Sequence, residues 1–235
     1  MANLSNPLDR AGWEAIWTRG DIPARYRTLA KPEDAVVEWA QTLPAGAAIL
    51  DLGCGVGRHC LYLGGLGCRM AGQDVSPSGI EQTAAACAER GISFEGKRSP
   101  ITTIPWADAT FDGVLSTATI HHGLRAEVDR AVAEVRRVLK PGGSFLVDLI
   151  ATDRLEYQEQ KDRAAQGVIQ EIEPNTFLDE NNMYDTDGFL PHHYFDEAET
   201  RDLLSAFEIV RLWTTQTQQG DINRWVAVAT RPLSG

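Results

Sequence analysis

The sequence lacks several features that mark particular classes of protein. Its 235 residues contain no run of about 18 apolar residues, so no membrane span is predicted. The N-terminal residues have neither the basic start nor the apolar stretch of a secretory signal peptide. We therefore expect a cytoplasmic protein without membrane contact.

Positive charge is also scarce. The chain has 22 Lys and Arg against 33 Asp and Glu, which gives a net charge of −11. Nucleic acids and anionic membranes attract basic proteins, so this balance argues against both as partners. We expect the partner to be a small molecule, and the chain to be a monomer or a homodimer.

Cysteine is sparse and poorly spaced for metal binding. None of the four cysteines forms a CxxC pair or has a histidine at zinc-finger spacing. We interpret them as reduced thiols and predict no metal site. The four are Cys54, Cys60, Cys68 and Cys87.

Short apolar runs alternate with helix-forming segments over the middle of the chain. This alternation implies right-handed crossovers and a parallel sheet that is covered on both faces. Residues 141–143, Pro-Gly-Gly, predict a turn. A helix at 196–206 and an antiparallel pair of strands at 208–213 and 224–230 complete the pattern. Earlier strands are expected at 47–50, 69–75, 92–94, 111–116 and 144–150, and helices at 32–41, 58–65, 76–91 and 126–139.

Two segments do not follow this alternation of strands and helices. Trp13 and Trp17 are four residues apart and share one face of a helix, so residues 1–30 are interpreted as an N-terminal helical lid. The remainder, residues 31–235, is interpreted as one domain. Its polar segment 151–195 is interpreted as an insertion, partly helical, that lies over a site.

A glycine loop follows the first strand of the domain. Gly53, Gly55 and Gly57 let the backbone turn tightly and approach a ligand closely, and the next helix offers free N–H groups. The dinucleotide fingerprint G-x-G-x-x-G is not met, because Arg58 stands where the third glycine belongs. The Gly-Lys-Ser/Thr of a phosphate-binding loop is also absent.

Two carboxylates end the first two strands. Asp51 would repel a pyrophosphate but attract the amino group of a zwitterion. Asp74 stands where a doubly wound sheet holds a ribose, and a carboxylate can accept hydrogen bonds from both hydroxyls. An acid for an amine, a glycine turn and an acid for a ribose describe S-adenosylmethionine better than a nicotinamide dinucleotide.

Four motifs in the correct order resemble the class I S-adenosylmethionine-dependent methyltransferases. Small-molecule members of the ubiquinone-biosynthesis and tellurite-resistance type are the most similar, because of Ile120-His121-His122. The motifs are ILDLGCGVGR at 49–58, DVSP at 74–77, IPW at 104–106 with FDGV at 111–114, and VLKPGG at 138–143.

The resemblance implies an α/β fold: a Rossmann-like, doubly wound, mostly parallel sheet of seven strands with an antiparallel last strand. It also implies S-adenosylmethionine as cofactor and S-adenosylhomocysteine as product. The family often holds the adenine with an acidic residue where this chain has Pro100, so we expect the backbone and Ser99 to serve there. The candidate cofactor-binding residues are Asp51, Gly53, Cys54, Gly55, Gly57, Asp74, Val75, Ser99 and Thr117.

The methyl acceptor is expected beside the fourth strand. His121 and His122 are candidate general bases, since neutral histidine suits proton transfer near pH 7; the alternative is a polar turn or a core histidine. The candidate pocket residues are Trp17, Tyr26, His121, Tyr184, His192 and His193.

The predicted reaction is in-line transfer of a methyl group to a small nucleophile. Two other functions stay open: a domain that binds S-adenosylmethionine without catalysis, and a nicotinamide-dependent oxidoreductase on a similar sheet. A nucleic-acid methyltransferase is disfavoured by the charge. Residues 116–122 also read Ser-Thr-Ala-Thr-Ile-His-His rather than a base-reading Asn-Pro-Pro-Tyr.

Overall fold

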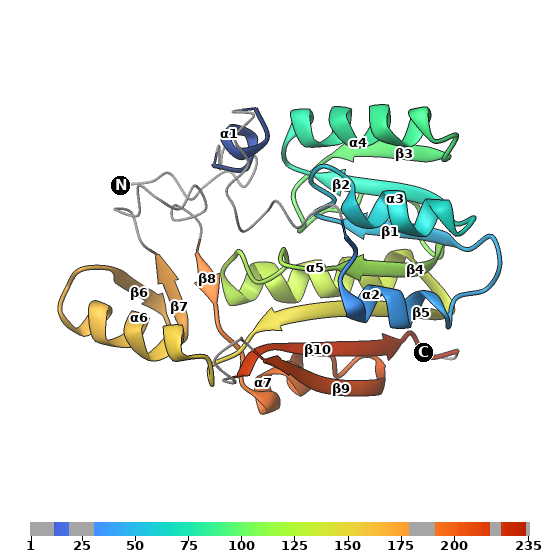
Figure 1. The fold of residues 1–235 in the computed structure, drawn as a ribbon. Helices are drawn as coiled ribbons and strands as arrows, with labels where there is room; N and C mark the ends of the chain where they lie inside the picture. Colours follow the sequence, from blue (N-terminus) through green and yellow to red (C-terminus); the bar gives the residue numbers. More distant parts are fainter. Residues whose placement is uncertain (1–11, 19–30, 179–190, 217–221, 234–235) are drawn as a thin grey trace.

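The computed structural model describes residues 12–18, 31–178, 191–216 and 222–233. A seven-stranded sheet forms its centre, in the order β3-β2-β1-β4-β5-β10-β9 (Figure 1). β1 to β5 are parallel, and β10 runs antiparallel to both β5 and β9, which confirms the predicted fold class. The strands are β1 Ala48–Leu52, β2 Arg69–Asp74, β3 Phe94–Arg98, β4 Phe111–Ser116, β5 Leu139–Ile150, β9 Glu208–Gln216 and β10 Ile222–Thr230.

Helices cover both faces of this sheet. Successive residues of a strand point to opposite faces, so β1 sends Leu50 into one apolar cluster and Ile49 into the other. The first cluster packs under α5 and α7, and the second under α2, α3 and α4. The helices are α1 Gly12–Thr18, α2 Asp34–Ala40, α3 Arg58–Gly65, α4 Pro77–Glu89, α5 Arg125–Val138, α6 Leu155–Ala165 and α7 Glu197–Leu203.

Local sequence signals explain several of these boundaries. Ser76 caps α4 by accepting a hydrogen bond from the Gly79 N–H at 3.0 Å, and Pro77 is the first helical residue, as predicted. Glu127 closes the start of α5 by accepting from the Leu124 N–H at 2.9 Å. Within the described ranges, no helix is long and apolar enough to cross a bilayer.

The insertion forms a small sheet of its own. β6 Gln170–Glu173, β7 Thr176–Leu178 and β8 His192–His193 pair antiparallel, and α6 lies beside them at one end of the large sheet (Figure 1). Ile150, Ile169, Phe177 and Tyr194 make its apolar core. The helix was predicted but the small sheet was not, because strands of two to four residues are too short to show a periodic pattern.

Two sequence predictions of local structure are corrected. The turn predicted at 141–143 lies inside β5, at a shift of register where β4 pairs first with Leu139 and next with Ser144. The third strand begins two residues later than the start predicted at 92, at Phe94, and runs to Arg98. It is an exposed edge strand, so its apolar alternation is weak. The division into a lid and a domain stays a prediction, since most of residues 1–30 lies outside the described ranges.

Candidate functional site

A cavity of about 710 Å³ opens at the carboxyl ends of β1, β2, β3 and β4. Its volume lies within the range of small-molecule pockets, and its place is where open α/β sheets bind ligands. One side is lined by the glycine loop and the ends of β2 and β3, including Gly53, Cys54, Gly55, Val56, Asp74, Val75, Ser99 and Pro100. The other side includes Trp13, Thr117, His121, His122, Arg154, His192, Tyr194 and Arg224.

The backbone conformation of the glycine loop requires glycine at three positions. Gly53, Gly55 and Gly57 have φ values of 83°, 50° and 86°, in the left-handed region. A Cβ on Gly53 would lie 2.2 Å from Thr119 Oγ1, and one on Gly57 would lie 2.6 Å from Thr83 Cγ2. The N–H groups of Gly53 and Cys54 donate to the Gln73 carbonyl at 2.7 and 3.0 Å. The loop is therefore fixed on β2, and its bare backbone faces the cavity.

Asp74 is held in place at the end of β2. One carboxylate oxygen accepts from the Gly55 N–H at 2.8 Å, and the other accepts from the Ser76 N–H at 2.9 Å. Burial raises the pKa of Asp74, while these backbone hydrogen bonds oppose that rise. The carboxylate keeps lone pairs for further donors, so it can accept from a diol in the cavity.

Asp51 and Gly57 lie behind the loop, and neither is among the residues that line the cavity. Asp51 is only 2% exposed and accepts from the Cys60 thiol at 3.4 Å. Burial raises its pKa to about 7. Any effect of this carboxyl on a ligand therefore acts through the loop. Gly57 is the N-cap of α3.

The remaining cofactor-side candidates lie on the cavity wall. Cys54, Val75, Ser99 and Thr117 all line it. Burial raises the pKa of Cys54 well above its ordinary value, so its side chain is a neutral thiol. The Ser99 hydroxyl already donates to the Thr103 carbonyl at 2.7 Å. Pro100 lies next to it on the wall, where it offers no carboxylate.

The short helix α1 lies over the glycine loop. A Cβ on Gly55 would lie 3.0 Å from the Trp17 ring, and the Trp17 carbonyl accepts from Gln82 at 3.0 Å. Glu14 accepts hydrogen bonds from the hydroxyls of Ser76 and Ser78 at the start of α4. Burial raises the pKa of Glu14, but these hydrogen bonds outweigh it and leave the pKa lowered. The sequence pattern did not single out Glu14, because its partners are more than 60 residues away.

Three imidazole rings gather on the acceptor side. The centroids of His121 and His122 are 4.4 Å apart, and those of His122 and His192 are 4.5 Å apart. Burial lowers the pKa of His121 well below its ordinary value, and the neighbouring His122, Arg224 and His192 lower it further. His121 is therefore uncharged at neutral pH. Its Nδ1 is buried and has no hydrogen-bond partner within the described part of the chain.

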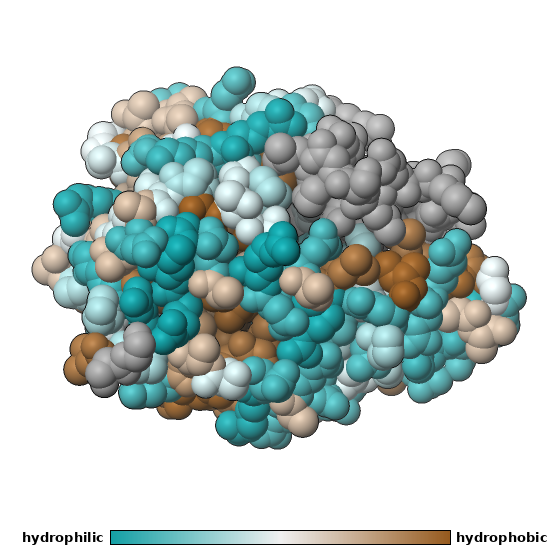
Figure 2. Space-filling model, turned by 180° about the vertical axis from the view of Figure 1, so that it is seen from behind, coloured by the Kyte–Doolittle hydropathy of each residue, from teal (hydrophilic) through white to brown (hydrophobic). Residues whose placement is uncertain are grey.

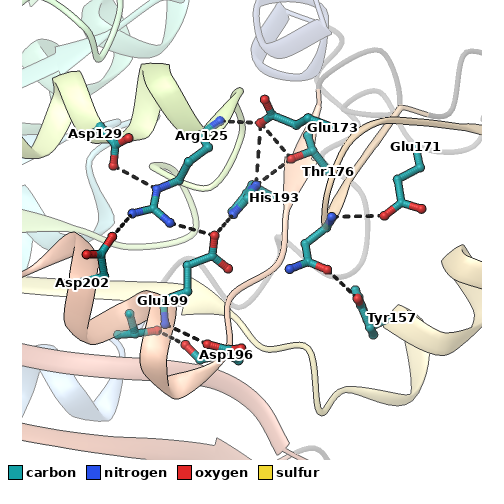
Figure 3. A network of polar contacts seen from close by, with 12 residues as sticks. Arg125, Asp129, Tyr157, Glu171, Glu173, Thr176, His193, Asp196, Glu199 and Asp202 are labelled. Carbon is teal, nitrogen blue, oxygen red and sulfur yellow. Dashed lines mark hydrogen bonds and ion pairs between the residues drawn. The ribbon is translucent and has the colours of Figure 1, made fainter.

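His193 does not reach the cavity, although the sequence suggested it as a pocket residue. Its Nε2 lies 2.9 Å from Glu199 Oε1, and its Nδ1 lies 2.6 Å from Thr176 Oγ1 (Figure 3). Glu199 in turn accepts from Arg125 Nη1 at 2.7 Å. Adjacent residues of a strand point to opposite sides, so only His192 faces the cavity. Tyr26 and Tyr184, also suggested, lie outside the described residues.

A buried ion pair shapes the loop after β4. Asp148 Oδ1 accepts from the Ala118 N–H and from Arg224 Nη1, both at 2.8 Å. Ala118 has a φ of 49°, which is uncommon for a residue with a side chain. The ion pair holds this conformation and so directs the segment that carries His121. The sequence gives no local signal for it, because Asp148 and Arg224 are 76 residues apart.

A second ion pair lies on the wall between the two sides. Arg58 Nη2 donates to Glu33 Oε1 at 2.8 Å, and both residues line the cavity. Burial raises the pKa of Glu33, and the charge of Asp148 adds to the rise. Among the residues that the structure places, no group of three or more His, Cys, Asp or Glu is arranged to hold a metal ion.

Comparison with known proteins agrees with this geometry. Residues 50–147 match the family model described as a methyltransferase domain. An S-adenosyl-L-methionine-dependent Diels-Alderase of Talaromyces variabilis is 30% identical over 190 residues, 75% of this chain and 62% of that protein. A tRNA (carboxymethyluridine(34)-5-O)-methyltransferase of Mus musculus is 32% identical over 142 residues, 60% of this chain and 20% of that protein.

The chain thus spans less than two thirds of the length of these two relatives. A solved structure of the 1,6-didemethyltoxoflavin-N1-methyltransferase of Burkholderia thailandensis, with S-adenosylhomocysteine bound, has the same fold. It superimposes with a TM-score of 0.68 at 19% identity and covers 99% of this chain and 93% of that one. The match over residues 50–147 and the shared fold thus both point to a methyltransferase domain of the kind that uses S-adenosylmethionine.

Proposed function

We propose that the domain transfers a methyl group from S-adenosylmethionine to a small organic acceptor. One observation carries the proposal. A single cavity of about 710 Å³ joins the glycine loop and Asp74 on one side to the rings of His121, His122 and His192 on the other. A cofactor and an acceptor bound in these two halves would lie next to each other.

The residues on the cofactor side fit S-adenosylmethionine. We assign the ribose hydroxyls to Asp74, whose carboxylate is already fixed by two backbone N–H groups. The methionine end is assigned to the bare backbone of Gly53 and Gly55, where a side chain would collide with its neighbours. The adenine is assigned to Val75 and to the backbone around Ser99, both on the cavity wall.

When bound, the cofactor supplies a methyl group on a sulfonium, and its leaving group is a neutral thioether that needs no acid. The task of the protein is to align the acceptor and exclude water, and alignment can lower the barrier by roughly 7–11 kcal/mol. α1 covers the glycine loop through Trp17, and the small sheet brings His192 to the acceptor side. Burial and the nearby Arg224 disfavour the protonated form of His121, so this ring helps to shape the acceptor side as a neutral side chain rather than as a base.

The acceptor is proposed to be a small molecule rather than a nucleic acid. The net charge of −11 opposes binding to a phosphate backbone. Figure 2 shows one face of the molecule, on which apolar residues are interspersed among hydrophilic ones. The Burkholderia protein, which shares the fold, is described as binding 1,6-didemethyltoxoflavin, and this supports an acceptor of similar size here.

Calorimetric titration of S-adenosylmethionine tests the cofactor half of the proposal. Replacing Asp74 by Ala removes hydrogen bonds to a charged group, so binding should weaken by about 10- to 100-fold. Asp74→Asn keeps the shape of the side chain, and its affinity for S-adenosylmethionine should fall between those of the wild type and Asp74→Ala. Asp108→Ala is the control, because Asp108 lies on the surface away from the cavity. Unchanged binding in Asp74→Ala would contradict the assignment.

Formation of S-adenosylhomocysteine with a panel of acceptors tests the transfer itself. The Talaromyces relative is described as a Diels-Alderase, which gives the experiment a second possible outcome. Tight cofactor binding together with conversion of an acceptor, but without S-adenosylhomocysteine, would contradict methyl transfer. It would favour a reaction in which the cofactor is not consumed.

A further inference from the structure

Two arginine side chains line the cavity where β5 ends and α6 begins. Arg224 of β10 pairs with Ile150, the last residue of β5, and Arg154 is the N-cap of α6. The Ala151 N–H donates to the Asn223 carbonyl, and the Arg154 N–H donates to the Ala151 carbonyl, both at 3.3 Å. These backbone hydrogen bonds hold both arginines at the same end of β5, and both line the cavity together with Ile150.

Arg224 is anchored from behind the cavity wall. Its Nη1 donates to Asp148 Oδ1 at 2.8 Å, and Asp148 is 2% exposed and is not among the residues that line the cavity. The N–H groups on Nε and Nη2 of Arg224 have no hydrogen-bond partner within the described ranges. A buried carboxylate thus fixes the guanidinium, which keeps donors for a ligand in the cavity.

Arg154 is held more loosely. Its Nη2 lies 2.6 Å from Glu156 Oε2, and among the residues that the structure places its other guanidinium N–H groups have no partner. The side chains of Arg154 and Glu156 are 29% and 40% exposed. A solvent-exposed ion pair of this kind contributes little free energy. An anion in the cavity can therefore compete with Glu156 for this guanidinium.

The chemistry of the two side chains suits an acidic ligand. A guanidinium stays charged at every physiological pH, and its planar N–H donors match the two oxygens of a carboxylate. The positive charge of Arg224 reaches the acceptor side, since it is one of the causes that lower the pKa of His121. This end of the cavity therefore combines positive charge with N–H donors.

We propose that the methyl acceptor carries a carboxylate group, which the guanidiniums of Arg154 and Arg224 bind through their remaining N–H donors. This inference rests on the proposed methyl transfer and names the chemical class of the acceptor. Held at this end of the cavity, the acceptor would extend toward the glycine loop, where the cofactor is proposed to bind. An uncharged acceptor of the same shape would leave the guanidinium donors unused and should bind more weakly.

Three probes of one shape test the proposal by calorimetry, without any turnover. They are 2-naphthoate, which is an anion, 2-naphthamide, which is neutral, and 2-naphthylmethylammonium, which is a cation. Naphthoate should bind about tenfold more tightly than naphthamide, since hydrogen bonds to a charged group contribute on that scale, and the cation should bind most weakly. Added salt should reduce the preference for naphthoate, because it screens the charges. Each titration is run with and without S-adenosylhomocysteine.

Variants locate the binding. Arg154→Gln should remove most of the preference for naphthoate over naphthamide, and Arg154→Lys, which keeps the charge, should retain part of it. Arg224→Gln is made together with Asp148→Asn, so that no lone charge is left buried, and this double variant should also lose the preference. Arg211→Gln is the matched control, because Arg211 pairs with Glu38 on the surface and does not line the cavity.

The outcomes separate this inference from the proposed function. Equal binding of naphthoate and naphthamide, or no binding of naphthoate, overturns the substrate class. A preference that survives in both Arg154→Gln and the double variant overturns the role of the arginines. In these cases the proposed methyl transfer still stands if S-adenosylhomocysteine binds. If S-adenosylhomocysteine fails to bind while the preference still depends on the arginines, methyl transfer is contradicted but the carboxylate site stands.

Discussion

At the scale of single residues, glycine conformation decides what the cavity can hold. A Cβ on Gly53 would meet Thr119 at 2.2 Å, whereas Gly46, with a φ of 68°, has nothing within 4 Å of the place where a Cβ would lie. A side chain at either position would have to adopt a left-handed backbone conformation, which costs free energy. Only at Gly53 would the side chain also clash with a neighbour. Comparing the two positions therefore separates the cost of the backbone conformation from the cost of the steric clash.

Substituting Ala at these two positions should separate the costs. Gly46→Ala should lower the free energy of unfolding by about 1 kcal/mol, the cost of a left-handed Ala. Gly53→Ala should lower it by a further 1–3 kcal/mol, roughly the range for overpacking, and should also abolish cofactor binding. Urea unfolding and calorimetry measure both. Equal loss of stability in the two variants would show that Thr119 moves aside without cost.

The buried carboxyl of Asp51 makes a prediction about pH. Burial raises its pKa from 3.8 to about 7, so between these values the folded chain keeps a proton that the unfolded chain loses. Its contribution to the free energy of unfolding should therefore decline as the pH rises from 3.8 to about 7, and stay constant above that.

Asp51→Asn cannot ionise, so it should lack this decline. Relative to the wild type, the variant should gain up to about 4 kcal/mol across the window, at roughly 1.4 kcal/mol for each pH unit. Urea unfolding of both proteins at a series of pH values measures the difference. A difference that does not change with pH would mean that Asp51 is ionised in the folded chain.

At the scale of elements, the network around His193 fastens the small sheet to the domain. His193 bridges Thr176 of β7 and Glu199 of α7, and Glu199 is held by Arg125 at the start of α5 (Figure 3). The His193 N–H also donates to the His121 carbonyl at 2.9 Å. β8 is thereby fixed beside the cavity, with His192 on the cavity side.

Loss of the His193 side chain should loosen this attachment. His193→Ala removes the hydrogen bonds to Glu199 and Thr176 and leaves these side chains only Arg125 and Glu173 as partners, so the free energy of unfolding should fall by about 2 kcal/mol. Hydrogen exchange of β7 and β8 should accelerate, while that of α3 should not. His193→Gln can still donate to Glu199 and should lose less. His192→Ala is the matched control on the same strand, with a change of less than about 1 kcal/mol. Equal effects at 192 and 193 would contradict the role of the network.

At the scale of the whole molecule, sequence reasoning succeeded where signals are local. The strand–helix alternation, the glycine loop and the Ser76-Pro77 helix start each depend on neighbouring residues, and the fold class followed from them. It failed where structure depends on distant pairs. The Asp148–Arg224 ion pair and the contact of Glu14 with Ser76 join residues 76 and 62 positions apart. The opposite directions of His192 and His193 depend on a strand too short to predict.

The position of α1 links the two halves of the cavity through one helix. Trp17 covers the glycine loop, and Trp13, on the same helix, contacts His122 on the histidine side of the cavity. A ligand in either half that favours the docked helix would therefore raise the affinity of the other half, and this coupling is reciprocal.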